Sequence, residues 1–333
     1  MKPLVSILIP AFNAGKWIAD AIDSALTQTW PNKEVIVVDD GSRDETLSIA
    51  RSYSSKEVKV VSQENQGAAA ARNQAYALCQ GDYIQWLDAD DLLRPDKIAK
   101  QMKAVEHGKG PRTLLSSAFG TFMHRPHKAR FSPTPLWCDL SPVEWLIRKM
   151  GQNCSMQTAT WLVSRELTEA TGPWNIQLHV DDDGEYFCRA LLASNGTKFV
   201  REAQVLYRMT DASRVSFIGH SDRKMAAMFL STQLCIHYLR TLEDSDRVRA
   251  ACVNYLQFRL PEFYPERLDL VEKAAQLAAS LGGRLQLPPP FSWKYAWIEK
   301  CFGPSVAKRA SISMPQYRWA IARFGDNLLA RFD

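Results

Sequence analysis

The stretch "QWLDADDLL" at residues 85–93 places three carboxylates, Asp88, Asp90 and Asp91, directly after an apolar run. In an extended segment residues i and i+2 point to the same side, so Asp88 and Asp90 face together while Ala89 points away. Like charges this close repel one another, so the cluster needs a positive partner. Two facing carboxylates are typical of a Mg²⁺ or Mn²⁺ site; the alternative is that Asp90 or Asp91 caps the helix that follows.

Segments with strand-like and helix-like patterns alternate through the first hundred residues. Continuous apolar, β-branched runs are typical of strands buried on both faces, and apolar residues at helical spacing lie between them. Strict alternation predicts an α/β fold with a mainly parallel, Rossmann-like central sheet flanked by helices. The strands are expected within residues 4–10, 33–42, 58–64 and 82–91, and the helices within residues 17–29, 43–55 and 67–79.

Polar residues follow three of these strands. They are Asn13 after the first strand, Asp39 and Asp40 after the second, and the acidic cluster after the fourth. Ligands of such sheets bind beyond the carboxyl ends of the strands, so the three positions predict one site. The first turn, "PAFNAGKW", has no GxGxxG, and the chain has no GxxxxGKS/T motif. A NAD-binding domain and a nucleotidyltransferase both need a glycine-rich turn, so the pattern favours a nucleotide diphosphate held through a metal on carboxylates.

Four stretches resemble family 2 glycosyltransferases with the GT-A fold, in that family's order and spacing. The resemblance implies an inverting transfer of a sugar from a nucleotide-diphospho-sugar to an acceptor hydroxyl, with Mn²⁺ or Mg²⁺ as cofactor. The stretches cover nearly all of residues 4–100 and read "VSILIPAFNAGKWIADAIDSALTQTW", "EVIVVDDGSRDETLSIA", "NQGAAAARNQA" and "GDYIQWLDADD".

The resemblance also implies roles for residues on the nucleotide side of the site. Pro10, Ala11 and Asn13 match the loop that lies along the nucleotide. Asp39 matches the carboxylate that accepts a hydrogen bond from the imide nitrogen of the base, which favours uracil or thymine. Asp40 lies beside it, and the alternative for Asp40 is a structural role in the turn.

Further matches concern the diphosphate and the sugar. Arg72 matches the basic residue that reaches the base or the diphosphate, and the alternative is an ion pair with a surface acid. Asp88 is similar to the residue that contacts ribose or sugar hydroxyls, and Asp90 to the direct metal ligand. Many relatives place a histidine near the diphosphate after Tyr-Arg, but Met209 follows Arg208 here. Arg208, Ser213 and Arg214 are then candidates for the diphosphate.

The catalytic base is expected in the second half of this region. In the family, an acidic dipeptide followed six residues later by arginine carries the base. Asp183 stands six residues before Arg189, so Asp182 and Asp183 are the candidate catalytic residues. Asp181 extends the acidic run, which leaves the register open by one residue.

We expect a GT-A domain at residues 1–215, with a nucleotide-sugar-binding half at 1–100 and an acceptor half at 101–215. Residues 216–333 show helical patterns and form a helical C-terminal extension. Aromatic and basic residues interleave after residue 290. Packing onto the catalytic domain and contact with a membrane that carries a lipid-linked acceptor are both open interpretations.

The composition is that of an ordinary soluble protein, with 46% hydrophobic and 23% charged residues. Seven cysteines without a CxxC pair are typical of reduced core thiols, and the chain shows no secretory signal or spanning segment. The expected location is cytoplasmic, with peripheral contact at the inner face of the membrane. Residues 201–333 carry 19 Lys and Arg against 13 Asp and Glu, but no aromatic-basic platform for nucleic acid.

The resemblance therefore implies a metal-dependent hexosyltransferase-type enzyme that uses a nucleotide-sugar and a glycan or lipid-linked acceptor. Asp39 favours a UDP-sugar as the donor. The alternative is a nucleotide-sugar-binding module without transfer activity in a glycan-assembly complex. Carboxylates are present at all three expected positions, which favours the enzyme.

Overall fold

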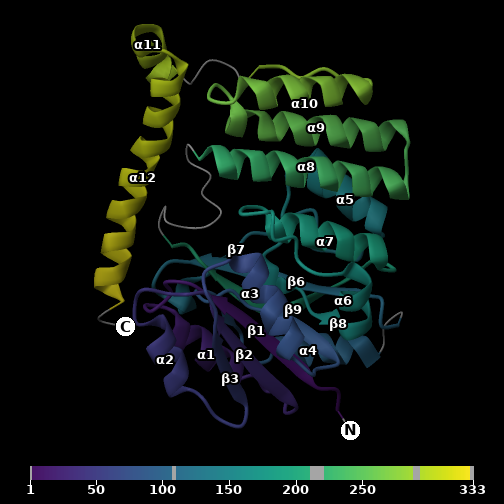
Figure 1. Ribbon diagram of the computed structural model, residues 1–333, viewed down its shortest axis with the longest axis vertical. Helices are drawn as coiled ribbons and strands as arrows, with labels where there is room; N and C mark the ends of the chain where they lie inside the picture. Colours follow the sequence, from purple (N-terminus) through teal and green to yellow (C-terminus); the bar gives the residue numbers. More distant parts are fainter. Residues whose placement is uncertain (1, 107–109, 211–220, 288–292, 331–333) are drawn as a thin grey trace.

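The computed structural model describes residues 2–106, 110–210, 221–287 and 293–330 of the 333-residue chain. An α/β region forms one half of the molecule, and a stack of C-terminal helices forms the other half (Figure 1). No helix in the described part of the chain is long and apolar enough to cross a membrane.

The central sheet has the strand order β3-β2-β1-β4-β8. The first four strands run parallel, and β8 is antiparallel to β4. The buried β-branched residues of β1 and β2 explain their place in the middle of the sheet, where both faces are covered. The strands are β1 (Val5–Ala11), β2 (Lys33–Asp39), β3 (Val58–Ser62), β4 (Tyr83–Trp86) and β8 (Val163–Ser164).

Helices connect the parallel strands as the sequence predicts. They are α1 (Ile18–Leu26), α2 (Thr46–Ser52) and α3 (Ala68–Leu78). In α1 the apolar stripe formed by Ile18, Ala21, Ile22 and Ala25 is buried, which gives the helix one face toward the sheet. The predicted α/β architecture with a helix-flanked sheet is confirmed.

A second sheet, with the order β5-β9-β6-β7, was not predicted. Its two long strands, β6 (Leu114–Phe122) and β9 (Thr197–Arg208), run parallel, and β5 (Leu92–Leu93) and β7 (Arg130–Phe131) pair antiparallel at the edges. The expected helix after the acidic cluster begins only at Lys97, as α4 (Lys97–Glu106), because Leu92 and Leu93 pair with β9.

The remaining elements of the α/β region are short. In α5, Ser141 caps the first turn by accepting a hydrogen bond from the Glu144 amide, and Pro142 occupies the first helical position. These elements are η1 (Pro126–Lys128), α5 (Pro142–Gly151), η2 (Thr158–Thr160), α6 (Arg165–Thr171) and α7 (Asp182–Ala193).

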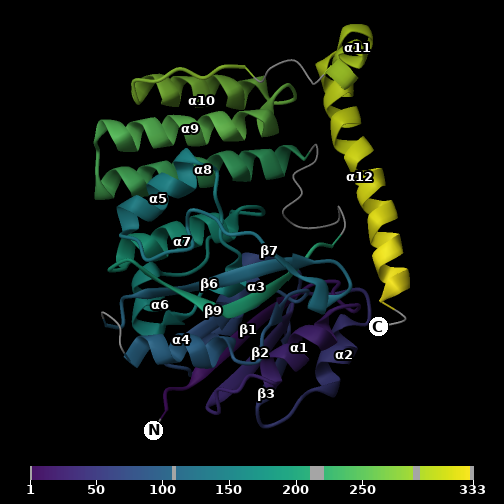
Figure 2. The same cartoon turned by 180° about the vertical axis from the view of Figure 1, so that it is seen from behind.

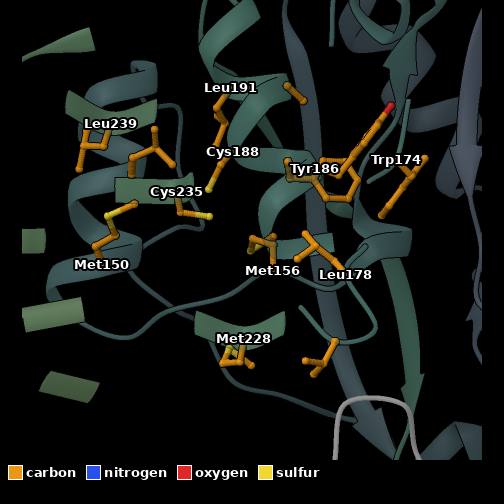
Figure 3. Close-up of a cluster of buried hydrophobic side chains, with 14 of the residues drawn as sticks. Met150, Met156, Trp174, Leu178, Tyr186, Cys188, Leu191, Met228, Cys235 and Leu239 are labelled. Atoms are coloured by element: carbon orange, nitrogen blue, oxygen red, sulfur yellow. The ribbon is translucent and has the colours of Figure 1, made fainter. Parts of the chain in front are cut away.

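The C-terminal helices α8 (Asp222–Leu242), α9 (Asp246–Phe263) and α10 (Leu268–Ser280) are stacked on α5 and α7. Buried side chains from both parts form one continuous hydrophobic cluster, and Figure 3 shows Met150, Cys188, Met228 and Cys235 within it. The expected boundary near residue 215 lies outside the described residues. Helices α8–α10 thus pack onto the α/β region, whereas the two open interpretations concern the residues after 290.

Two further helices, α11 (Trp293–Phe302) and α12 (Pro304–Leu329), run along one side of the molecule in both views (Figures 1 and 2). Asp326 fastens the far end of α12, because it pairs with Arg125 at 2.8 Å. Phe302 and Phe324 are 63% and 72% exposed, so these helices only partly pack on the rest of the chain. Cys301 is also exposed, so the expectation that all cysteines are core thiols is wrong for this residue.

Candidate active site

The nucleotide side of the predicted site forms where β1 and β2 end. The Asp40 amide donates to the Ala11 carbonyl at 2.8 Å, and the Arg43 amide donates to Asn13 Oδ1 at 2.8 Å. Asn13 has a left-handed backbone with φ of 49°, a conformation that asparagine tolerates better than most residues. The loops after the two strands are thus joined, and Ala11, Asn13 and Asp40 lie together as predicted.

Asp39 has one engaged and one unengaged carboxylate oxygen. Its Oδ2 accepts hydrogen bonds from the Ser42 amide at 3.3 Å and from the Ser62 hydroxyl at 3.2 Å. Its Oδ1 is buried and has no hydrogen-bond partner among the described residues. Pro10 and Ala11 lie beside it on the neighbouring strand, because Ala11 pairs with Asp39 in the register of the sheet. A buried acceptor without a donor is costly unless a ligand supplies one.

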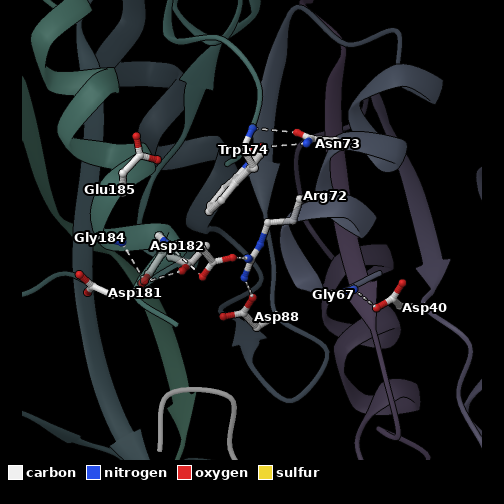
Figure 4. Close-up of polar contacts among 12 residues, drawn as sticks. Asp40, Gly67, Arg72, Asn73, Asp88, Trp174, Asp181, Asp182, Gly184 and Glu185 are labelled. Atoms are coloured by element: carbon white, nitrogen blue, oxygen red, sulfur yellow. Dashed lines mark hydrogen bonds and ion pairs between the residues drawn. The ribbon is translucent and has the colours of Figure 1, made fainter. Parts of the chain in front are cut away.

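Asp40 holds the loop that precedes α3. Its Oδ1 accepts from Gln63 Nε2 at 2.7 Å and from the Gln66 amide at 2.9 Å, and its Oδ2 accepts from the Gly67 amide at 2.8 Å (Figure 4). Gly67 has a φ of 95°, which a side chain would strain. Both oxygens of Asp40 therefore position the start of α3, and its contact with a nucleotide stays a prediction.

Arg72 on α3 joins the two predicted halves of the site. Its Nη2 pairs with Asp88 Oδ1 at 2.8 Å, and its Nη1 pairs with Asp182 Oδ2 at 2.5 Å (Figure 4). The side chains of Arg72 and Asp182 are only 6% and 11% exposed. Arg72 is thus the positive partner that Asp88 requires, and its partners are site carboxylates rather than a surface acid. Its predicted contact with the base or the diphosphate is not tested.

Trp174 packs against Arg72 and was not predicted as a site residue. The Arg72 guanidinium lies 4.4 Å from the centre of the Trp174 ring. That ring stacks on Tyr186 at 4.0 Å, and Asn73 forms two hydrogen bonds with the Trp174 backbone, at 2.8 and 2.9 Å. The contact of a guanidinium with the face of an aromatic ring is energetically favourable and fixes the orientation of the guanidinium. In the sequence, the Gly-Pro-Trp turn was the feature that could have indicated a role for Trp174 in the site.

Asp90 and Asp91 form no side-chain ion pair with the residues that the structure describes. Asp91 is fully buried, and its Oδ1 accepts from the Arg208 amide at 2.9 Å, while its Oδ2 has no partner among the described residues. The alternative that Asp91 caps the next helix is therefore wrong. The Asp90 side chain accepts a long hydrogen bond of 3.4 Å from the Thr210 hydroxyl. Burial and the charge of Asp88 raise the pKa of Asp90 to about 6.

Arg208 ends β9 next to the acidic cluster. Its Nη2 pairs with Asp20 at 2.8 Å, and its Nε donates to the Asp90 carbonyl at 2.8 Å. The guanidinium also lies between aromatic rings, 4.4 Å from the centre of Trp17 and 4.7 Å from the centre of Phe122. Arg208 therefore positions the backbone of Asp90, and its role toward a diphosphate stays a prediction.

The carboxylates of the cluster fit a divalent cation. Burial raises the pKa of both Asp90 and Asp91, the charge of Asp88 raises both further, and Arg208 acts in the opposite direction. A divalent cation would favour the ionised form of both carboxylates. Within the described ranges, no three His, Cys, Asp or Glu side chains gather as a closed metal site. Mg²⁺ and Mn²⁺ can bind at a site with fewer protein ligands, because phosphate and water complete their coordination. Ser213 and Arg214 lie outside the described residues.

The predicted base residues lie at the start of α7. Asp182 is the first residue of the helix, and Asp183 follows it. Asp183 Oδ1 accepts from the Gly184 amide at 2.8 Å, and its Oδ2 accepts from the Thr158 hydroxyl at 3.3 Å. Burial raises the pKa of Asp183 to about 6, with further contributions from the charges of Asp182 and Asp181. Asp183 forms no ion pair with the described residues.

Asp181 connects the base helix to the C-terminal helices, which the sequence did not predict. Its backbone is left-handed, with φ of 56°. Its Oδ2 accepts from the Ser231 hydroxyl of α8 at 2.7 Å, and Arg259 of α9 lies 3.4 Å from its Oδ1. Gly184 leaves room for this carboxylate, because a Cβ there would lie 2.4 Å from Asp181 Oδ1. The α7 N-terminus is therefore held from behind by α8 and α9.

Comparisons with known proteins identify the family of this arrangement. Residues 6–145 match the family model of glycosyl transferase family 2. Residues 6–145 therefore form a glycosyltransferase family 2 domain. An uncharacterized glycosyltransferase of Rickettsia typhi is 31% identical over 218 residues, which cover 63% of this chain and 65% of that protein. The putative teichuronic acid biosynthesis glycosyltransferase TuaG of Bacillus subtilis is 43% identical over 105 residues, which cover 31% of this chain and 42% of TuaG.

The matched region thus spans less than two thirds of the length of these family 2 relatives. Among solved structures, S. aureus TarS 1–349 resembles this chain with a TM-score of 0.57 and 17% identity, over 83% of this chain and 90% of that one. TarS 1–349 has also been solved in complex with UDP-GlcNAc, and that structure matches with a TM-score of 0.58 over 84% of this chain and 92% of that one. The predicted GT-A fold is confirmed.

Proposed function

We propose that this chain is an inverting glycosyltransferase that moves a sugar from a UDP-sugar to an acceptor hydroxyl of a glycan or a lipid-linked glycan. The observation that carries the proposal is the ion-pair bridge of Arg72, which holds Asp88 of the donor half against Asp182 of the acceptor half. A donor bound along the ends of β1, β2 and β4 would then have its sugar beside the start of α7. Polysaccharide synthesis is supported by the similarity to TuaG, a putative teichuronic acid biosynthesis glycosyltransferase.

Asp39 supports a uracil nucleotide as the donor. Its buried Oδ1 needs a hydrogen-bond donor, and the imide N–H of uracil supplies one. An unsatisfied buried acceptor costs about 1–3 kcal/mol, so a base without an N–H at that position should bind more weakly. The related fold of TarS has been crystallised with UDP and with UDP-GlcNAc, which makes UDP the first nucleotide to test.

Asp90, with Asp88 beside it, would hold Mn²⁺ or Mg²⁺. A bound divalent cation supplies Lewis-acid stabilisation of the negative charge on a leaving diphosphate. In the protein Asp91 is buried, Asp90 is partly buried, and Arg208 fixes the Asp90 backbone.

Asp183 is the better placed of the two candidate bases. Burial raises the pKa of Asp182 and the charge of Arg72 counteracts this, but the ion pair with Arg72 occupies Asp182 Oδ2 and makes this carboxylate less available to an acceptor hydroxyl. Asp183 has no ion pair among the described residues, and its pKa of about 6 lies close to a working pH near neutrality. We infer that Asp183 takes the proton from the acceptor hydroxyl, while Asp182 and Arg72 keep the start of α7 in place.

Turnover of two matched variants tests the proposal. With UDP-sugars, Mn²⁺ and a panel of glycan acceptors, Asp183→Asn should lower the rate of UDP release roughly 10²–10⁴-fold, the usual range for loss of a general base. The affinity for UDP and Mn²⁺, measured by calorimetry, should stay close to that of the unaltered protein. Loss of activity in Asp182→Asn alone would move the base to Asp182. Tight UDP binding without turnover of any donor would instead indicate a binding module.

A further inference from the structure

A pocket of about 620 Å³ lies beside the segment that leads into α7, and none of the predicted donor-site residues lines it. Its volume lies within the range of ordinary small-ligand pockets. Three elements line it: the start of α3, the segment before α7 and the first turns of α8 (Figure 1). The lining residues that matter for its chemistry are Gln66, Ala70, Ile176, Gln177, His179 and Arg223.

The position of the pocket relates it to the acceptor. Ala70 lies two residues before Arg72 on α3, and His179 lies three residues before Asp182. On α8 the lining residue Leu230 directly precedes Ser231, whose hydroxyl binds Asp181. The lining residue His179 is close enough to Asp182 for their charges to interact, and the amide of the lining residue Gln66 donates to Asp40 Oδ1 at 2.9 Å. The pocket therefore lies near the Arg72–Asp182 ion pair, next to the loop that Asp40 holds. An acceptor that delivers its hydroxyl to Asp183 has space here.

The charge of the lining is unusual for a site so close to carboxylates. No Asp or Glu lines the pocket, whereas Arg223 and His179 do. Arg223 is exposed and has no hydrogen bond or ion pair to the described residues. Burial lowers the pKa of His179, and the charge of Arg223 lowers it further, so the two side chains are close enough to interact. Both would gain from an anion placed between them.

The walls of the pocket are apolar, which restricts the class of ligand that can bind there. Small side chains at Ala70, Ala226 and Ala227 form one side, and Ile176 is 58% exposed at the rim. Apolar walls with a few polar groups suit the faces of a sugar ring. An isolated inorganic ion would leave these walls uncovered.

We propose that the pocket is an acceptor subsite for a sugar unit that carries a negatively charged carboxylate or phosphate, recognised by Arg223 and His179. This inference rests on the proposed transferase function, because it assigns the acceptor to the space beside Asp183. Gln66 and Gln177 supply hydrogen-bonding groups for the hydroxyls of the same sugar unit. A neutral sugar would lose the ionic contact and bind more weakly.

Binding of defined sugars to the full chain tests the subsite. The protein is first saturated with Mg²⁺ and UDP, so that the probes cannot occupy the donor site. Mg²⁺ is used because it is diamagnetic and does not broaden the histidine signals. Histidine side-chain NMR signals then follow titrations with methyl β-D-glucuronide, glucose 6-phosphate and the neutral methyl β-D-glucoside, with the His179 signal assigned from a His179→Gln variant. At least one anionic probe should shift the His179 signal and bind about tenfold more tightly than the glucoside. The tighter of the two anionic probes identifies the charged group.

Arg223→Gln and Lys224→Gln form a matched pair, since each removes one positive charge from the start of α8 and only Arg223 lines the pocket. Arg223→Gln should weaken the anionic probe about tenfold and leave the glucoside unchanged, and Lys224→Gln should have little effect. Equal affinity for the charged and neutral probes would overturn the proposal. So would an equal loss in both variants, or a loss of UDP affinity in Arg223→Gln. Failure of the unaltered protein to bind UDP would instead contradict the proposed function.

Discussion

The pKa of Asp183 provides a measurable signature for the proposed base. Burial and the neighbouring carboxylates raise it to about 6. A general base acts only when it is deprotonated, so turnover should rise with pH through this value and level off above about pH 7. One pH unit below the pKa about a tenth of the carboxyls are ionised, so the rate at pH 5 should be roughly a tenth of the plateau.

Thr158→Val should move this acid limb in a known direction. The Thr158 hydroxyl donates to Asp183 Oδ2 at 3.3 Å and therefore favours the ionised carboxylate. Its loss disfavours that form and raises the pKa. A good hydrogen bond to a charged group contributes about 1.5–3 kcal/mol. Because the hydrogen bond from Thr158 is long, we expect it to stabilise the ionised carboxylate by about 0.7–1.4 kcal/mol. At about 1.4 kcal/mol per pKa unit, the midpoint should rise by about 0.5–1 pH unit.

Initial rates of UDP release between pH 5 and 8 provide the assay. The metal and the donor must be saturating, because Asp90 also has a pKa of about 6 and its protonation would weaken metal binding. Thr160→Val is the control, since its hydroxyl donates to the Gln157 carbonyl in the same 3₁₀ turn rather than to Asp183. A midpoint near pH 4 in the unaltered protein would refute the reasoning, as would equal shifts in the two variants.

Three other predictions concern the metal, the base helix and the C-terminal helices. Asp90→Ala should abolish metal-dependent UDP binding in calorimetry; unchanged affinity would show that the metal is held elsewhere. Gly184→Ala should lower the free energy of unfolding by about 1–3 kcal/mol in urea, because its Cβ would lie 2.4 Å from Asp181 Oδ1. Gly151→Ala, whose Cβ meets nothing closer than 3.9 Å, should be near neutral, and equal losses would contradict the steric argument. Residues 291–333 carry seven Lys and Arg against three Asp and Glu, so the chain should sediment with anionic vesicles and release as salt rises. Equal sedimentation with uncharged vesicles would exclude this electrostatic attraction.

The parts of the fold that local pattern determines could be predicted from the sequence. Strands β1 to β4 and helices α1 to α3 appear where apolar runs and helical spacing place them. The parallel order brings Asp39 and Asp88 to the same edge, as the alternation of elements requires. The resemblance to a known family located Asp182 and Asp183, which composition and spacing alone would not have singled out.

Contacts between distant segments could not be predicted in this way. Arg72 and Asp182 are 110 residues apart, and no local pattern specifies their pairing. The two-residue strand at Leu92 and Leu93 depends on β9, more than a hundred residues later, and in isolation it resembles the start of a helix. The binding of Asp181 by Ser231 and Arg259 depends in the same way on how α8 and α9 pack.

The attachment of Asp181 to α8 and α9 has a consequence for exchanging parts between related enzymes. A chimera that takes its acceptor half from one relative and its C-terminal helices from another would separate Asp181 from the Ser231 and Arg259 positions that hold it. The hydrophobic cluster would be divided at the same place, because its side chains come from both parts. Helices α8 and α9 should therefore be transplanted together with α7, so that acceptor preference and the setting of the base are inherited as one unit.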